Sequence, residues 1–211
     1  MTRAIIGIVG AIIVAAMSPA QAQHAAGPRV PLVQDDSTDP DVQATFKDLK
    51  ERGTKPLNLH RIYANAPKIA RAQSALAKAL RGDATVPRVD RELIILRATQ
   101  LVHGEYEHDE HKPIAMSCGI TAEQIDALAH WRDSKLYSDR QRAILAYADG
   151  MASADGVDDT TFAAMQKFFK PREIVEITMN AGFYMGSSQA SRALGVSAIG
   201  NPPKSGYGTC N

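Results

Sequence analysis

The residues best suited to chemistry lie in one run of nine, His103–His111. The run holds three histidines and four carboxylates, with no Lys or Arg among them. It would occupy about two and a half turns of helix. A solvated helix face usually mixes both signs of charge. This run is therefore typical of a site where protons are transferred or a metal is bound.

Helical spacing divides the run into two faces. Side chains three and four residues apart share a face, which places Glu107 with His111 and groups Glu105, Asp109 and Lys112 in a charged stripe. We expect the Glu107–His111 pair to face inward and the stripe to face solvent. A carboxylate beside an imidazole can exchange protons near neutral pH, as general acid–base catalysis requires. A salt bridge that only stabilises the helix is the alternative.

Metal binding is a second interpretation of the same run. His103, Glu107 and His111 recur at steps of four, and His108 precedes His111 by three. Two or three of them could ligate a divalent ion. The pattern is not one of the strong zinc motifs, and Gly104 interrupts the helix between the first two members. The main prediction is therefore no cofactor, with a metal-dependent enzyme as the alternative. The isolated His60 and His130 favour capping or packing roles.

The N-terminus predicts export. Arg3, an apolar stretch at 4–17 and the sequence Ala-Gln-Ala at 20–22 form a signal peptide over residues 1–22. A periplasmic or secreted protein with no membrane attachment after cleavage follows from this. The net charge of +1, without a basic patch interleaved with aromatics, disfavours nucleic-acid binding.

The two cysteines of the chain are far apart in sequence, at Cys118 and Cys210. An oxidising compartment permits a disulfide between them, which would pin the C-terminal tail to the domain. Two free thiols are equally compatible with the sequence.

Apolar periodicity predicts an all-α fold of about eight helices in a single domain, without period-2 strands. An irregular lead-in (23–39) precedes the domain (40–196), and a tail rich in Gly, Pro and Ser (197–211) follows it. Helix starts are marked by Asp39 before Pro40, by Asp90, and by Thr121 with Gln124 as a capping box. The expected helices cover residues 40–52, 57–64, 67–80, 91–102, 105–117, 122–130, 138–152, 160–169 and 171–193.

Three stretches, in this order and spacing, resemble the carboxymuconolactone decarboxylase family, which shares its fold with the AhpD-type alkylhydroperoxidases. They span most of residues 40–196: Arg91–Arg97 running on into Gly104–Ala115; Cys118–Ile125; and Arg142–Tyr147, Glu173–Met179, Gly182–Tyr184 and Ala193–Val196. The resemblance implies an AhpD-like helical bundle. It also implies a homo-oligomer, a trimer or hexamer, and the apolar residues of 174–184 suit an interface.

The family's redox branch is marked by a Glu followed twelve residues later by CxxCxxxH. Glu92 and His111 match this pattern, but Gly104 and Glu107 stand at the two cysteine positions. A peroxidase of that branch forms a disulfide between those cysteines, and Cys118 has no resolving partner nearby in sequence. A thiol peroxidase is therefore disfavoured, and the chain resembles the non-redox branch.

That branch implies a lyase or isomerase, decarboxylase-like, that moves protons on a small lactone or aromatic-derived carboxylated substrate. This chemistry belongs to the catabolism of aromatic compounds. His111 is the expected general acid–base, with Glu92 acting from the preceding helix; both are carried over from the family motif. The alternative on the same scaffold is a non-catalytic small-molecule binding protein.

Four further assignments rest on spacing alone. Glu107 would orient His111 or relay its proton, and Arg97 would bind a substrate carboxylate. Tyr106 and His103 are additional substrate-binding candidates, although Tyr106 points a different way on the helix.

Overall fold

The computed structural model describes residues 27–199, 201 and 210. The predicted export signal and most of the predicted tail lie outside these residues. Within them the fold is all-α, as the sequence predicts, and no strand is present. The helices are α2 (Pro40–Glu51), α3 (Asn58–Tyr63), α4 (Pro67–Lys78), α5 (Arg88–Leu101), α6 (Glu105–Ser117), α7 (Ala122–Ala127), α8 (Asp139–Ala152), α9 (Asp159–Gln166) and α10 (Pro171–Leu194), with a π-helical turn η1 (Ala79–Asp83) and a 3-10 turn η2 (Leu128–His130).

Helix α5 lies at the centre of the fold, packed against α6, α8 and α10. Every residue from Asp90 to Thr99 is buried, including charged ones. Because α5 is surrounded on all sides, its charged side chains need partners inside the fold. Its Leu93, Ile94 and Leu96 belong to the main hydrophobic core.

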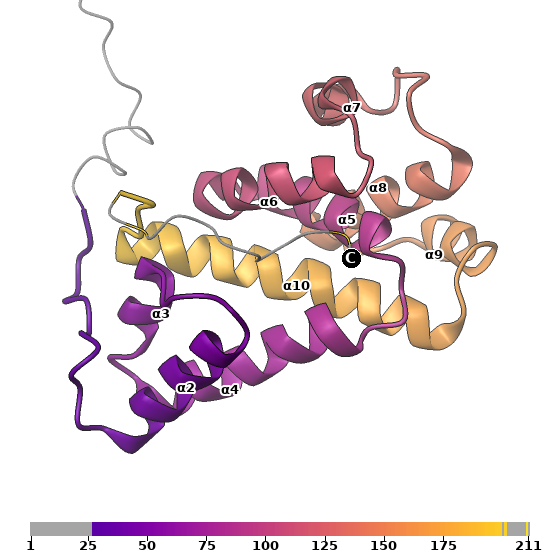
Figure 1. Cartoon of the computed structure of the whole chain (residues 1–211). Helices are drawn as coiled ribbons and strands as arrows, with labels where there is room; N and C mark the ends of the chain where they lie inside the picture. Colours follow the sequence, from indigo (N-terminus) through magenta and orange to yellow (C-terminus); the bar gives the residue numbers. More distant parts are fainter. Residues whose placement is uncertain (1–26, 200, 202–209, 211) are drawn as a thin grey trace, which may run out of the picture.

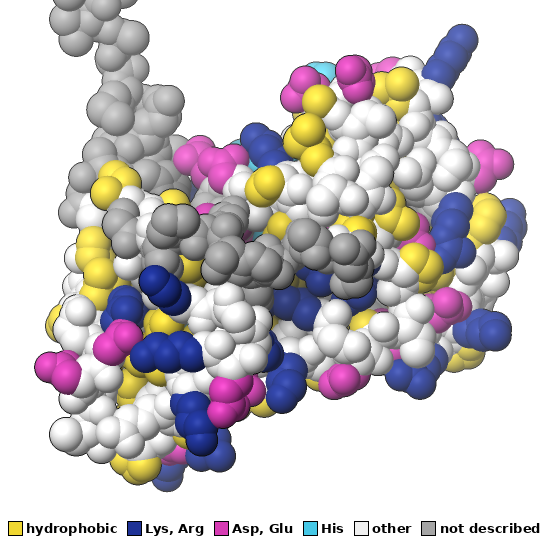
Figure 2. All heavy atoms as spheres, viewed as in Figure 1, with side chains coloured by type: hydrophobic (Ala, Val, Ile, Leu, Met, Phe, Trp, Pro, Cys, Tyr) yellow, Lys and Arg dark blue, Asp and Glu magenta, His cyan; other side chains and the backbone are white. Residues whose placement is uncertain are grey.

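The long helix α10 runs through the middle of the molecule (Figure 1). Helices α2, α3 and α4 lie on one side of it in this view, and α6, α7 and α8 lie on the other (Figure 1). Because α10 contacts α5, α6 and η1, it joins the N-terminal helices to the core. Figure 2 shows acidic and basic side chains interspersed over one face of the molecule.

Local capping signals place most helix starts correctly. The Asp39 carboxylate accepts from the backbone N–H of Val42, with Pro40 in the first helical position. Thr121 and Gln124 form the predicted capping box of α7. Asp90 was expected to cap the next helix, and that expectation is wrong.

Helix α5 begins at Arg88, directly after Pro87, whose ring fixes φ near the helical value. Asp90 therefore lies inside the first turn, where it accepts from Arg140 Nη2 at 2.7 Å. Among the described helices, none combines the length and apolar character needed to cross a membrane.

Candidate functional site

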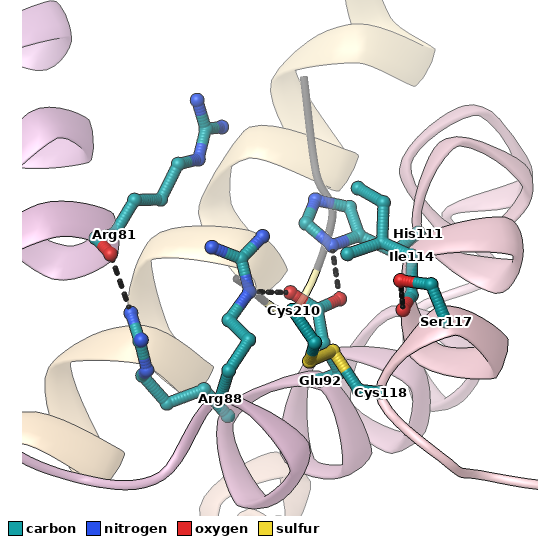
Figure 3. The surroundings of a disulfide bond; sticks show 9 residues. Arg81, Arg88, Glu92, His111, Ile114, Ser117, Cys118 and Cys210 are labelled. Carbon is teal, nitrogen blue, oxygen red and sulfur yellow. Dashed lines mark hydrogen bonds and ion pairs between the residues drawn. A yellow bond between two sulfur atoms is a disulfide. The ribbon is translucent and has the colours of Figure 1, made fainter. Parts of the chain in front are cut away.

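A buried hydrogen bond joins α5 to α6 at the position that the sequence singled out. Glu92 Oε2 lies 2.7 Å from His111 Nδ1, and the residues are 0% and 3% exposed (Figure 3). Arg88 Nε donates to the other carboxylate oxygen at 2.5 Å. Burial raises the pKa of Glu92, but His111 and Arg88 together hold it below its usual value. Glu92 is therefore a permanent carboxylate at neutral pH.

This contact fixes which nitrogen of His111 is available. Because a carboxylate only accepts, Nδ1 carries a proton directed at Glu92, and Nε2 remains as the nitrogen that can take or give one. The imidazole also packs edge-to-face with the ring of Tyr184, whose centroid lies 4.6 Å away. Burial raises the pKa of Tyr184, and its hydroxyl accepts from Arg81 Nε at 3.1 Å.

Glu107 is buried, as predicted, but it does not orient His111. Its Oε1 accepts from Ser187 Oγ at 2.6 Å. One turn of α6 separates the two side chains, so that Glu107 bonds to α10 while His111 bonds to α5. The expectation that Glu107 orients the imidazole is therefore wrong. Glu92 orients it instead, through its contact with Nδ1.

Two small adjoining cavities lie against these residues. We call the first, of about 30 Å³, the histidine chamber, and the second, of about 40 Å³, the apolar chamber. They share four lining residues: Leu59, His60, Arg81 and Glu107. The histidine chamber is also lined by Leu57, Tyr106, Glu110, His111 and Ile114. The apolar chamber is closed mainly by small and apolar side chains, among them Leu49, Tyr63, Ala70, Ala77 and Phe183.

Of the three remaining residues predicted to bind substrate, Tyr106 lines a chamber, whereas His103 and Arg97 do not. Tyr106 lines the histidine chamber, and its hydroxyl accepts from Asn201 Nδ2 at 3.2 Å. His103 is exposed in the turn before α6, with φ at +53°. Arg97 does not line either chamber: its Nε donates to Asp149 at 2.7 Å and its Nη1 to Gln100 at 2.6 Å. The structure therefore does not bring Arg97 to the site.

The four proposed metal ligands are not brought together either. His103 precedes the first turn of α6. His108 is turned to α5, with Nδ1 3.1 Å from the Leu96 carbonyl and 3.2 Å from Thr99 Oγ1. Within the described part of the chain, no group of three or more His, Cys, Asp or Glu could hold a metal ion. The spacing that suggested a metal site thus holds only for an uninterrupted helix, and the helix begins after Gly104.

Several residues of the site were not predicted from the sequence. Arg88 could have been found, because it lies four residues before Glu92 on one helix face. Arg81, Tyr184 and Ser187 come from η1 and α10, and nothing in the sequence relates those segments to His111. His60 has the predicted capping role, since its Nδ1 accepts from the Leu57 N–H at 3.0 Å, but it also lines both chambers.

The two cysteines form a disulfide, Cys118–Cys210. Figure 3 shows this bond beside Glu92 and His111. Cys118 caps the C-terminus of α6, so the bond attaches the described tail residue Cys210 to the helix that carries His111. The partner that Cys118 lacks nearby in sequence comes from 92 residues away.

The fold and the site define the class of protein: an all-α domain with a buried Glu–His pair beside a small cavity. Residues 67–150 match the model of the carboxymuconolactone decarboxylase family. This part of the chain is similar to that family, and it lacks the CxxC dithiol of the redox branch.

Solved structures show the same fold. A protein of unknown function from Agrobacterium tumefaciens, suggested to be the antioxidant defence protein AhpD, is 24% identical with a TM-score of 0.61, over 67% of this chain and 97% of that one. The debrominase Bmp8 is 16% identical, with a TM-score of 0.67 over 80% and 91% of the two chains. A peroxidase-related protein from Silicibacter is 21% identical, with a TM-score of 0.65 over 87% and 98%. At these identities the likeness establishes the AhpD-like fold alone. A search of curated proteins gave no match.

Proposed function

We propose that the protein is a lyase or isomerase that moves protons on a small lactone or aromatic-derived carboxylated substrate, without a cofactor. One observation carries this proposal: His111 lines a cavity while its Nδ1 is held 2.7 Å from the buried carboxylate of Glu92. A carboxylate in this position fixes the tautomer and stabilises the imidazolium formed when Nε2 takes a proton. The absence of the family dithiol at Gly104 and Glu107 favours proton transfer over thiol redox chemistry.

The residues support a balanced proton-transfer step. In an isomerisation, neutral His111 removes a proton from carbon beside a conjugated carbonyl and returns it at another carbon. In a decarboxylation, the bond to the carboxylate carbon breaks, its electron pair enters the conjugated carbonyl, CO₂ leaves, and protonated His111 supplies a proton to carbon. Neither route needs an oxidant or reductant. Glu107 lines both chambers and would relay a proton in this proposal.

The cavities limit the size of the substrate. At about 30 and 40 Å³, each has room for one or two water molecules, so even a short acid or one small ring would enter only as the lining side chains move apart. The predicted signal peptide supports activity outside the cytoplasm, in the periplasm or after secretion. Exposed apolar side chains on α4 and α10, such as Ile69 (69%) and Val175 (61%), support assembly into a homo-oligomer, a trimer or hexamer.

Nuclear magnetic resonance in D₂O tests the proposal without knowledge of the natural substrate. The substrates would be small unsaturated lactones and carboxylic acids, including α-angelica lactone, whose isomerisation needs only a proton shift. We expect deuterium incorporation or product formation, reduced roughly 100-fold or more in His111→Gln with unchanged helicity by circular dichroism. The matched control is His130→Gln, at an exposed histidine. Full activity of His111→Gln would contradict the proposal, and binding without exchange would indicate a non-catalytic binding protein.

A further inference from the structure

We propose that His60 is a fixed, neutral hydrogen-bond donor that, together with Arg81, holds the carbonyl oxygen of the substrate as it becomes negatively charged. This inference deepens the proposed function and rests on it. It names the substrate class as carbonyl compounds with an acidic C–H bond, of which an unsaturated lactone is the smallest cyclic example.

The backbone fixes the tautomer of His60. The N–H of Leu57 donates to His60 Nδ1 at 3.0 Å, at the start of α3. A backbone N–H can only donate, so Nδ1 must be an unprotonated acceptor, and the proton of the neutral ring must be on Nε2. His60 therefore offers an N–H donor on the edge opposite its capping contact.

The surroundings keep this ring neutral. Burial, and then the positive charges of Arg81, Arg52 and Arg61, lower the pKa of His60 to about 3. The carboxylate of Glu107 lines the same two chambers and is the opposing charge. Since protonation would also break the capping bond to Leu57, the donor on Nε2 persists at neutral pH.

The donor residue lines the same cavity as His111. His60 and Arg81 line both chambers, and His111 lines the histidine chamber beside them. When His111 Nε2 removes a proton from carbon, the electron pair of the C–H bond moves to the carbonyl oxygen and gives an enolate. A neutral N–H and a guanidinium that line the same cavity as the base are suited to that oxygen. Return of the proton from His111 completes the isomerisation with no net gain or loss of electrons.

Glu107 sets the direction of binding. Its carboxylate would repel an enolate oxygen, so the oxygen should approach the donors of His60 and Arg81 rather than Glu107. Replacing Glu107 by Gln should therefore leave anion binding unchanged or strengthen it, whereas loss of the His60 donor should weaken it.

Two variants separate the donor from the cap. His60→Asn keeps an acceptor near the position of Nδ1 and removes the donor on Nε2, whereas His60→Gln can place an amide N–H near Nε2. The probe is tetronate, the stable enolate of a five-membered lactone, titrated by calorimetry. We expect wild-type binding, a loss of about tenfold or more in His60→Asn, and partial recovery in His60→Gln. His130→Asn is the matched control, and melting temperatures check folding.

The outcomes are distinct from those of the proposed function. Tetronate binding that fails in the wild type, or is equal in wild type and folded His60→Asn, overturns the inference. Binding that depends on His60 supports it even when no lactone turns over, in which case only the proposed reaction fails. Nitrogen-15 spectra of the wild-type protein give a check independent of any variant. They should show a proton on Nε2 of His60 with no titration between pH 5 and 8, and a titrating ring would overturn the inference.

Discussion

Gly104 lies so close to Ser188 that a Cβ built on it would be 2.1 Å from Ser188 Oγ and 2.3 Å from Ser188 Cβ. The glycine has φ at −87°, which any residue can adopt, so the constraint is steric. Gly104 stands at the first cysteine position of the redox branch. Helix α10 therefore packs against α6 in a way that leaves no room for a side chain there.

We expect Gly104→Ala to lower the free energy of unfolding by about 1–3 kcal/mol, because the new methyl group overpacks the α6–α10 contact. Urea unfolding measures the change. Gly186→Ala is the matched control: a Cβ there meets nothing within 4 Å, and the substitution should stabilise helix α10 by up to about 1 kcal/mol. Recovery of stability in Gly104→Ala with Ser188→Gly would confirm the contact, and a neutral Gly104→Ala would contradict it.

Glu92 gives the protein an acid-sensitive ion pair. Its folded pKa lies below its unfolded value, because His111 and Arg88 outweigh the opposing effect of burial. Such a carboxylate stabilises the fold above its unfolded pKa, near 4.5, and the stabilisation is lost as the pH falls through the folded pKa. Acid should therefore destabilise the wild type progressively below about pH 4.5.

Glu92→Gln should remove this stabilisation, with a loss of about 1.5–3 kcal/mol at neutral pH and a flatter dependence on pH in the acid range. Urea unfolding from pH 3 to 7 measures both. The exposed Asp155→Asn, in the turn after α8, should retain the wild-type curve. An acid limb in Glu92→Gln as steep as that of the wild type would show that another carboxylate is responsible.

Local signals in the sequence account for much of the fold. Helix starts at Pro40 and Ala122 follow from capping residues within four positions, so they can be read from a short window. Helix α5 was predicted as a helix, but its start was not, because Asp90 is drawn into a pair with Arg140 on α8. A tertiary contact overrode the local capping preference there.

The site was predictable only where a motif carried it. Glu92 and His111 fall on the family pattern, and the structure places them in contact. Arg81 and Tyr184 reach the pair from η1 and α10, about a hundred residues apart, and no local pattern records such a contact. The role of Glu107 was misjudged because helical spacing identifies the face of a side chain, not its partner on a neighbouring helix.

The disulfide Cys118–Cys210 should stabilise the fold without taking part in the reaction. It closes a loop with a sequence separation of 92, for which the chain-entropy model gives about 4–5 kcal/mol. We expect Cys118→Ser with Cys210→Ser to lower the melting temperature and to keep lactone turnover, because His111 and Glu92 carry the proposed chemistry. Reduced and alkylated wild type should behave in the same way. Peroxide reduction that depends on the thiols, with loss of it on alkylation, would instead restore the thiol hypothesis.

Substitution by Lys should affect stability at Arg97 and substrate binding at Arg81. Arg97 is 8% exposed and its Nε donates to Asp149, which also accepts from Trp131 Nε1 at 3.2 Å. The Arg97 guanidinium donates from Nε to Asp149 and from Nη1 to Gln100, and a Lys ammonium cannot reproduce both bonds. Arg97→Lys should therefore lower the free energy of unfolding by about 1.5–3 kcal/mol and leave KM unchanged. Arg81→Lys changes the wall of both chambers, so it should raise KM or weaken tetronate binding. A raised KM in folded Arg97→Lys would contradict this prediction and would indicate that Arg97 binds the substrate.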